Sequence, residues 1–184
     1  ATGSNIADAV ALGSTLWATS SGGLLRWDRE TGNLTQYVAP GVPLPSNQLS
    51  EIEPWQDGLI ISGYGGVAVF DGDASWTLYR DSDIGLTVSY HAPMAVYEDA
   101  VWLASDNNLA RLTPDGRWSK APSDTTQPGL GGITKLESRA DGLYVVYRLG
   151  AERTSPVQVS RYADGIWSIV DQPQREYFED PSGA

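Results

Sequence analysis

His91 is the only histidine of this 184-residue chain, which restricts the metal and nucleophile chemistry available to it. Without cysteine the chain has no thiolate ligand, no cysteine nucleophile and no disulfide, and one histidine cannot make a His-His zinc pair. A Ser-His-Asp triad through His91 would need a nucleophile elbow, and the order and spacing of residues point to none. We therefore predict no catalytic site, no metal site and no cofactor, and expect His91 to lie in a loop or at a strand start.

Two aspartate-rich stretches could supply the oxygen ligands that calcium prefers, about six to eight in number. They are FDGDASW at 70–76 and RDSDIG at 80–85. Neither has the loop pattern with a terminal glutamate that defines an EF-hand. We expect the first to be a hairpin turn and the second to be a solvated connector between strands.

A unit of about 42 residues recurs four times, and any side chains that bind a ligand must be positioned by this repeat. LWATSSGGLLRWD at 16–28 aligns with LIISGYGGVAVFD at 59–71, so that a Gly-Gly pair, an aromatic residue and an aspartate coincide. VWLASDNNLARLT at 101–113 continues the series, and LYVVYRL at 143–149 begins the fourth copy. Arg26, Arg111 and Arg161 then occupy the same position of their units.

Each unit contains four short strands separated by Gly, Asp and Asn turns, which is typical of an antiparallel meander. One such sheet cannot bury both of its faces, so the units must stack on one another. The predicted fold is all-β: a β-propeller array of four blades, each with four antiparallel strands. We place the blades at about 6–40, 47–81, 89–122 and 131–173, with a flexible start or cloning remnant at 1–5 and a C-terminal tail at 174–184.

The tryptophans could stack on sugar rings, because flat aromatic faces suit that contact. Six of the seven, however, recur at equivalent strand positions of the units: Trp17, Trp27, Trp76, Trp102, Trp118 and Trp167. Recurrence of this kind is typical of packing between repeats. We expect these six to lie in the core, and only Trp55 to fall outside the pattern.

The first unit, LWATSSGGLLRWDRETGNLTQY, resembles the two-component regulator propeller repeat, as does VWLASDNNLARLTPDGRWSK in the third. The resemblance weakens in the second and fourth units, which have Ile60 and Tyr144 where the repeat has tryptophan. That family occurs in periplasmic sensor regions of bacterial hybrid histidine kinases and in secreted proteins. The resemblance implies a non-catalytic recognition or sensor module in the periplasm or outside the cell, although it leaves the cytoplasm open.

Propellers of that family usually have more than four blades, so the count of four leaves three forms of closure. The chain is part of a longer ring, or two copies pair into an eight-bladed ring, or it closes alone as a small four-bladed ring. Open sheet edges need covering, and this favours the first two forms.

The net charge of −11 would repel the phosphate backbone of nucleic acids, so we expect no nucleic-acid partner. No apolar run approaches the roughly 20 residues needed to span a bilayer, and we expect no membrane contact from this segment. The remaining partners are a polar small molecule, a glycan, a protein, a second copy or further blades.

Binding residues are expected where the repeats differ, in loops on a constant scaffold. Two classes of loop emerge on one rim: those joining the second and third strands of a blade, and those leading to the next blade. Their side chains form the predicted ligand site: Tyr64, Tyr90, His91, Asp106, Arg148 and Arg153.

Three functions follow from these features, in decreasing order of support. The first is a sensor module that binds a ligand or protein through rim loops. The second is an assembly module that completes a ring. The third is a carbohydrate-active enzyme, which would require carboxylates clustered at general-acid spacing.

Overall fold

The computed structural model describes residues 5–105, 107–121, 132–150, 152 and 155–170. Its strands form four antiparallel sheets, each built from four strands in chain order. Blade 1 contains β1 (Ile6–Leu12), β2 (Thr15–Ser20), β3 (Gly23–Asp28) and β4 (Leu34–Tyr37). Blade 2 contains β5 (Leu49–Trp55), β6 (Gly58–Gly63), β7 (Gly66–Phe70) and β8 (Trp76–Arg80).

After the one-turn helix α1 (Asp81–Ile84), blade 3 contains β9 (Met94–Tyr97), β10 (Ala100–Ser105), β11 (Asn108–Leu112) and β12 (Trp118–Lys120). Blade 4 contains β13 (Ile133–Arg139), β14 (Gly142–Arg148), β15 (Val157–Ala163) and β16 (Ile166–Ile169). The predicted all-β fold of four four-stranded blades is confirmed.

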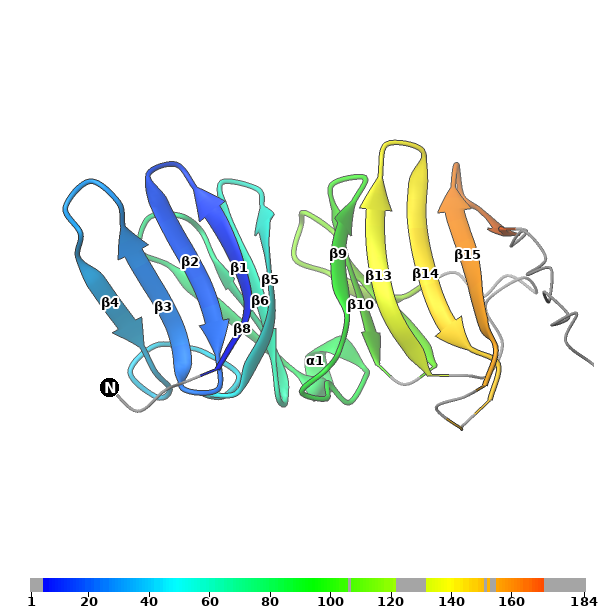
Figure 1. Ribbon diagram of the computed structural model, residues 1–184, viewed down its shortest axis with the longest axis horizontal. Coiled ribbons are helices and arrows are strands. Elements are labelled where there is room, and N and C mark those ends of the chain that lie inside the picture. The colour runs from blue at the N-terminus through cyan, green and yellow to red at the C-terminus, as the bar shows by residue number, and fades with distance from the viewer. Residues whose placement is uncertain (1–4, 106, 122–131, 151, 153–154, 171–184) are drawn as a thin grey trace, which may run out of the picture.

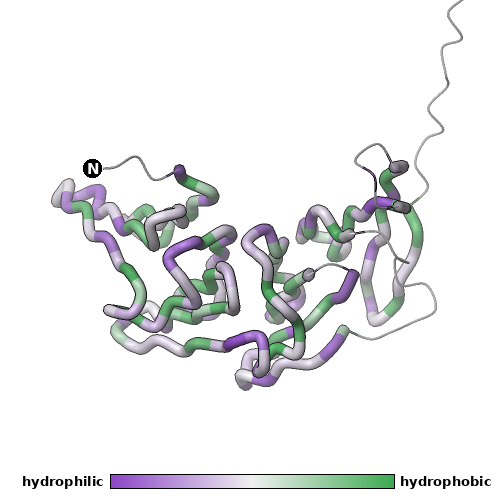
Figure 2. The backbone as a smooth tube through the Cα atoms, turned by 90° about the horizontal axis from the view of Figure 1, so that it is seen from below, coloured by the Kyte–Doolittle hydropathy of each residue, from purple (hydrophilic) through white to green (hydrophobic). Residues whose placement is uncertain are grey.

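The first strands of the blades, β1, β5, β9 and β13, pack side by side in that order. Figure 1 shows them along the middle of the molecule, with the sheets of blades 1 and 4 spread to either side. Seen from below, the four blades follow an arc that is open on one side (Figure 2). The described blades of one chain therefore do not close into a small four-bladed ring.

Three apolar clusters hold the arc together, each between two consecutive blades. Trp17 and Leu24 of blade 1 meet Leu59, Ile61 and Phe70 of blade 2. The second cluster joins blades 2 and 3, and the third joins blades 3 and 4. Because alternate residues of a strand point to opposite faces, each inner blade contributes to two clusters.

The tryptophan prediction is only partly correct. Trp17, Trp102 and Trp167 are buried, and Trp76 and Trp118 are half-buried. Trp27 is 42% exposed, contrary to prediction, because no described blade lies against its face.

Trp55, which lies outside the repeat pattern, is 5% exposed and belongs to the cluster between blades 2 and 3. Its Nε1–H donates to the carbonyl oxygen of Asp99 at 3.1 Å, which ties blade 2 to the turn that follows β9.

The aspartate-rich stretches shape turns. Asp71 accepts backbone N–H bonds from Asp73, Ala74 and Ser75 at 2.9–3.1 Å, as expected of a hairpin turn. These bonds, with the one from Asp73 first, hold the pKa of Asp71 below its ordinary value. The second stretch is more ordered than the expected solvated connector: it forms α1, and Asp81 accepts the Val88 N–H at 3.0 Å.

Candidate functional site

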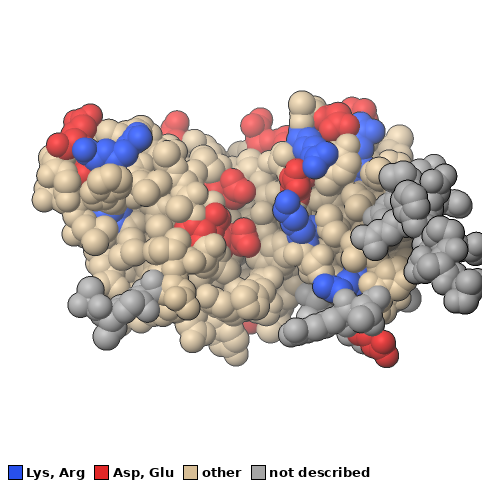
Figure 3. Space-filling view, viewed as in Figure 1, with Lys and Arg blue, Asp and Glu red and all other residues tan. Residues whose placement is uncertain are grey.

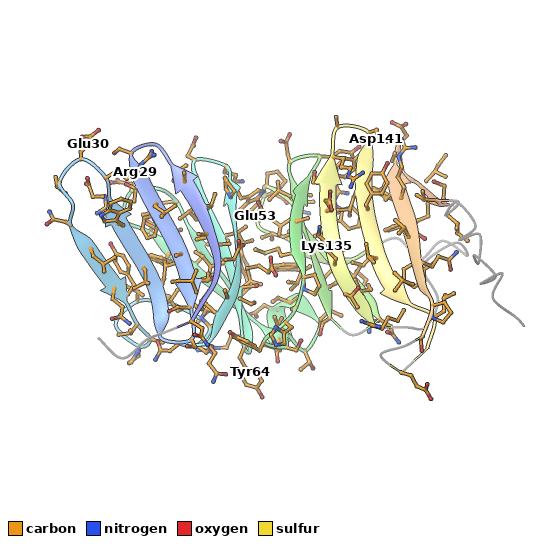
Figure 4. All side chains as sticks on the ribbon, viewed as in Figure 1. Arg29, Glu30, Glu53, Tyr64, Lys135 and Asp141 are labelled. Carbon is orange, nitrogen blue, oxygen red and sulfur yellow. The ribbon has the colours of Figure 1, made fainter. Side chains whose placement is uncertain are left out.

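Four of the six residues of the predicted rim site belong to the described part of the chain. Tyr64 lies in the turn between β6 and β7 and is 61% exposed, at the lower edge of Figure 4. Its backbone N–H donates to the Gln48 carbonyl at 3.1 Å, and that of Gly65 donates to the Val88 carbonyl at 3.0 Å. The turn is therefore clamped between the connectors that precede β5 and β9.

Tyr90 and His91 follow α1, with ring centroids 4.5 Å apart at 64°. His91 is exposed, and Arg148 is half-buried at the end of β14. Asp106 and Arg153 lie outside the described residues. Strand topology places the four described side chains on one rim, and their joint binding of a ligand stays a prediction.

A small cleft lies on the same rim, but other residues line it. Its volume is about 210 Å³, and it contains none of the four described side chains of the predicted set. It is lined by Gly85, Leu86, Thr87, Ser105, Asn108 and Lys120. The Ser105 hydroxyl donates to the Thr87 carbonyl there and joins β10 to the connector that follows α1.

A larger cleft, of about 510 Å³, opens between blades 1 and 2 at the opposite rim, where the β1–β2 and β7–β8 turns meet. We call it the blade 1–2 cleft. It is lined by Leu12, Gly13, Ser14, Thr15, Trp17, Arg26, Tyr37, Phe70, Gly72 and Asp73. A second cleft of about 340 Å³ lies between blades 2 and 3, against Trp55, Gln56 and Asp99.

Aromatic rings form the floor of the blade 1–2 cleft. Trp17 stacks on Tyr37 with centroids 5.8 Å apart at 24°, and it packs against Phe70 at 5.5 Å. Phe70 in turn contacts Trp76 at 4.7 Å. The Arg26 guanidinium carbon lies 5.7 Å from the centre of the Trp17 ring, within range of a cation–π contact.

Two ordered turns bring polar groups to the mouth of this cleft. In the β1–β2 turn the Arg29 guanidinium donates to the carbonyls of Gly13 and Ser14. In the β7–β8 turn Asp71 holds the loop that carries Asp73. The cleft thus combines a guanidinium, a carboxylate, hydroxyls and aromatic rings, which together can hydrogen-bond and stack on a polar ligand.

The sequence contained a signal for this cleft that we did not interpret as a binding site. Trp17 and Arg26 are directly opposite on β2 and β3, and Trp102 and Arg111 repeat that pairing on β10 and β11. The repeat pattern predicts that the tryptophans lie in the core and that Asp73 lies in a turn. Whether such side chains line a cleft depends on how far the neighbouring blade stands away.

Acidic side chains gather on the face formed by the first strands of the blades. Figure 3 shows them over the middle of this face, and Figure 4 labels Glu53 among them. Asp8 on β1 accepts the Ile52 N–H of β5 at 3.0 Å. Burial raises the pKa of Glu51 and of Glu53, and the charge of Asp8 adds to both shifts.

Replacing Glu51 and Glu53 together by glutamine is expected to change how stability depends on pH. A raised pKa means that the folded chain binds more protons than the unfolded chain above the ordinary value of 4.5. These two carboxyls therefore lower the free energy of unfolding as pH rises through and above that value. The double variant should gain stability relative to the parent over this interval, measured by urea unfolding from about pH 4 to about pH 7.

Glu137→Gln is the control of opposite sign. Hydrogen bonds from Lys135 and Arg139, at 2.7 and 2.9 Å, hold the pKa of Glu137 below its ordinary value. The ionised Glu137 carboxylate stabilises the folded chain at neutral pH, and this stabilisation is lost as pH falls. Compared with the parent, Glu137→Gln should therefore become less stable as pH rises. If the free energy of unfolding changes with pH in the same way for the parent and for Glu51→Gln/Glu53→Gln, the raised pKa of the two carboxyls is contradicted.

No family model matches the sequence, and no curated protein matches it. Solved structures do match. The extracellular domain of the putative one-component system BT4673 from B. thetaiotaomicron superposes with a TM-score of 0.68 at 14% identity, over 90% of this chain and 22% of that one. The corresponding domain of the putative hybrid two-component system BT3049 gives a TM-score of 0.66 at 13% identity, over 90% and 23%.

A catalytically inactive virginiamycin B lyase from Staphylococcus aureus, solved with quinupristin, gives a TM-score of 0.68 at 17% identity, over 94% of this chain and 57% of that one. The fold is that of a β-propeller. Sensor domains and lyases share it, so the fold by itself does not decide between recognition and catalysis. The chain spans less than a quarter of the sensor domains and somewhat more than half of the lyase.

The described residues contain no three His, Cys, Asp or Glu side chains placed to hold a metal ion. Nor does any helix among them have the length and apolar character needed to cross a membrane.

Proposed function

We propose that this chain is the recognition module of a bacterial extracytoplasmic sensor or secreted protein, and that it binds a hydroxyl-rich polar ligand in the blade 1–2 cleft. The observation that carries this proposal is the composition of the cleft. The Arg26 cation and the Asp73 carboxylate lie beside an aromatic floor in a space of about 510 Å³. Volumes in this range are typical of small-molecule sites.

Sugars suit this chemistry better than apolar ligands. Their hydroxyls pair with guanidinium, carboxylate and hydroxyl groups, and their C–H faces pack on aromatic rings. The likeness to extracellular domains of signalling proteins supports a position outside the cytoplasm.

Arg26→Ala is expected to weaken binding of an oligosaccharide ligand about 10- to 100-fold, since a hydrogen bond to a charged group contributes about 1.5–3 kcal/mol. The probes are neutral and uronic-acid-containing oligosaccharides, screened by thermal shift and then titrated by calorimetry. The matched control is Arg117→Ala, in the β11–β12 turn, whose side chain is 84% exposed and pairs with Asp115.

Tyr64→Ala distinguishes the two rims. Loss of binding in Tyr64→Ala, with Arg26→Ala equal to the parent, would move the site to the rim predicted from the loops. If no oligosaccharide raises the melting temperature of the parent, a sugar ligand is contradicted.

A carbohydrate-active enzyme is the second candidate, favoured by the carboxyls of Glu51 and Glu53. A carboxyl whose pKa is raised by burial can remain protonated and act as a general acid. Release of reducing sugar by the parent, abolished in Glu51→Gln/Glu53→Gln, would establish this activity.

A further inference from the structure

One face of blade 1 is apolar, and no other described sheet lies against it. Strand pairing places two cross-strand rows on it, Ala11–Leu16–Trp27–Leu34 and Ala9–Ala18–Leu25–Gln36. We call this surface the blade 1 face. Its apolar side chains are Ile6, Ala9, Ala11, Leu16, Ala18, Leu25, Trp27 and Leu34. Trp27 is 42% exposed and Leu34 is 66% exposed.

The same positions are covered in the other blades. The residues equivalent to Trp27 are Phe70, Leu112 and Tyr162, which are 8%, 0% and 5% exposed. Each packs against the preceding blade. The sequence of blade 1 therefore carries the side chains of a blade interface on a face that no other described blade covers.

The outer face of blade 4 is the complementary surface, and we call it the blade 4 face. Its central row is Glu137–Tyr144–Arg161–Ser168, next to the row Lys135–Val146–Val159. Tyr144 and Arg161 correspond in register to Trp17 and Arg26 of blade 1 and to Trp102 and Arg111 of blade 3. This aromatic–arginine pair thus occurs on the same face of three blades.

In blades 1 and 3 the pair is covered by the next blade. Phe70 lies 5.5 Å from Trp17, and Tyr162 lies 4.9 Å from Trp102, measured between ring centroids. In each case an aromatic residue of the third strand covers the tryptophan. Trp27 is the residue of that type on the blade 1 face, and Tyr144 is the ring of the blade 4 face that it would cover. The Arg139 guanidinium lies over the Tyr144 ring at 4.9 Å in the single chain.

Charge agrees with this match. Asp8 on β1 faces the next blade, where its carboxylate accepts the Ile52 N–H. On the first strand of blade 4, Lys135 is at the position equivalent to Asp8 of blade 1. On the first strand of blade 1, Ala9 is at the position equivalent to Ile52 of blade 2. A blade 4 face placed on a blade 1 face would bring the Lys135 ammonium, which pairs with Glu137 at 2.7 Å, close to the carboxylate of Asp8 beside Ala9.

We propose that a second copy of this chain covers both faces, the blade 1 face of each copy packing on the blade 4 face of the other. The contact is head-to-tail, and two copies satisfy it twice in a closed ring of eight blades. Propellers typically have about four to eight blades, so eight is within the usual range. Closure in this way leaves neither the apolar blade 1 face nor the blade 4 face in water.

Light scattering and analytical ultracentrifugation across a wide concentration range test the pairing. The parent is expected at twice the chain mass of 19.8 kDa. Trp27→Asp and Tyr144→Asp should each be monomers, because each variant disrupts both contacts of the ring. Mixed in equal amounts, they should partly recover the dimer, because one contact then joins two unaltered faces.

Tyr64→Asp is the control, an exposed aromatic residue away from both faces, and it should remain dimeric. Circular dichroism should show the parent spectrum for Trp27→Asp, since Trp27 is not part of the cores between blades. If the parent has the mass of a single chain at every concentration, the proposal is wrong. A blade from another polypeptide segment would then be the candidate that covers the blade 1 face. A dimer that persists in Tyr144→Asp would overturn head-to-tail packing.

Discussion

Replacing Trp102 by alanine is expected to lower the free energy of unfolding by about 3–5 kcal/mol. The Trp102 side chain is fully buried between blades 3 and 4, with the Tyr162 ring centroid at 4.9 Å and that of Trp167 at 6.3 Å. Truncation removes the apolar contacts and leaves a cavity that two rigid sheets cannot fill.

Urea unfolding at constant pH measures this loss, with Tyr64→Ala as control. Tyr64 is an exposed aromatic residue, and its removal should change the free energy of unfolding by less than about 0.5 kcal/mol. A repeat array transmits stability mainly between neighbours. Hydrogen exchange in Trp102→Ala should therefore accelerate most in β13–β16 and least in β1–β4. A loss below about 1 kcal/mol would show that Trp102 is not central to this interface.

Gly58→Ala is expected to lower the free energy of unfolding by about 3 kcal/mol, because the added methyl group has no space. A Cβ at Gly58 would overlap the Phe70 carbonyl oxygen and lie 2.7 Å from the Gly72 amide nitrogen. Both neighbours are backbone, so neither can move aside as a flexible side chain would. The β7–β8 turn must shift, and it carries Gly72 and Asp73 of the blade 1–2 cleft.

The matched control is Gly132→Ala, where an added Cβ meets nothing within 4 Å. This variant should unfold at the parent's urea midpoint or slightly above it, since alanine restricts the unfolded chain. Gly58→Ala should also weaken any ligand of the cleft even where the variant remains folded. Equal urea midpoints for Gly58→Ala and Gly132→Ala would mean that the close packing of Gly58 against the β7–β8 turn is wrong.

Much of the fold could be predicted from the spacing of residues. Gly22-Gly23 and Gly65-Gly66 mark the same turn in two blades, and the strands on either side repeat in register. Because side chains alternate along a strand, the face of each residue follows once the strands are known. Leu59 and Ile61 point toward blade 1, while Ile60 points toward blade 3.

The two errors about tryptophan burial have one physical cause. Trp27 has the identity of a buried residue, and its exposure depends only on whether another sheet lies against its face. Trp55 shows the converse, since it lies outside the repeat and is buried between blades 2 and 3. Burial at a blade interface is a property of two sheets, and the pattern of one strand describes only one of them.

The same distinction applies to the candidate site. Connectivity alone places Tyr64, Tyr90, His91 and Arg148 on one rim, because consecutive antiparallel strands alternate in direction. It does not say where blades separate. The blade 1–2 cleft lies where two turns, ordered by Arg29 and Asp71, meet above a floor of packed aromatic rings.

The sequence by itself thus determined the repeating four-stranded unit, its count and the direction of its side chains, all of which follow from local period and turn chemistry. Only the tertiary structure decided that the four blades form an open arc, that Trp27 is exposed and that a cleft separates blades 1 and 2. These features depend on the distance and angle between sheets. That geometry results from side chains far apart in the sequence packing together, and no local pattern encodes it.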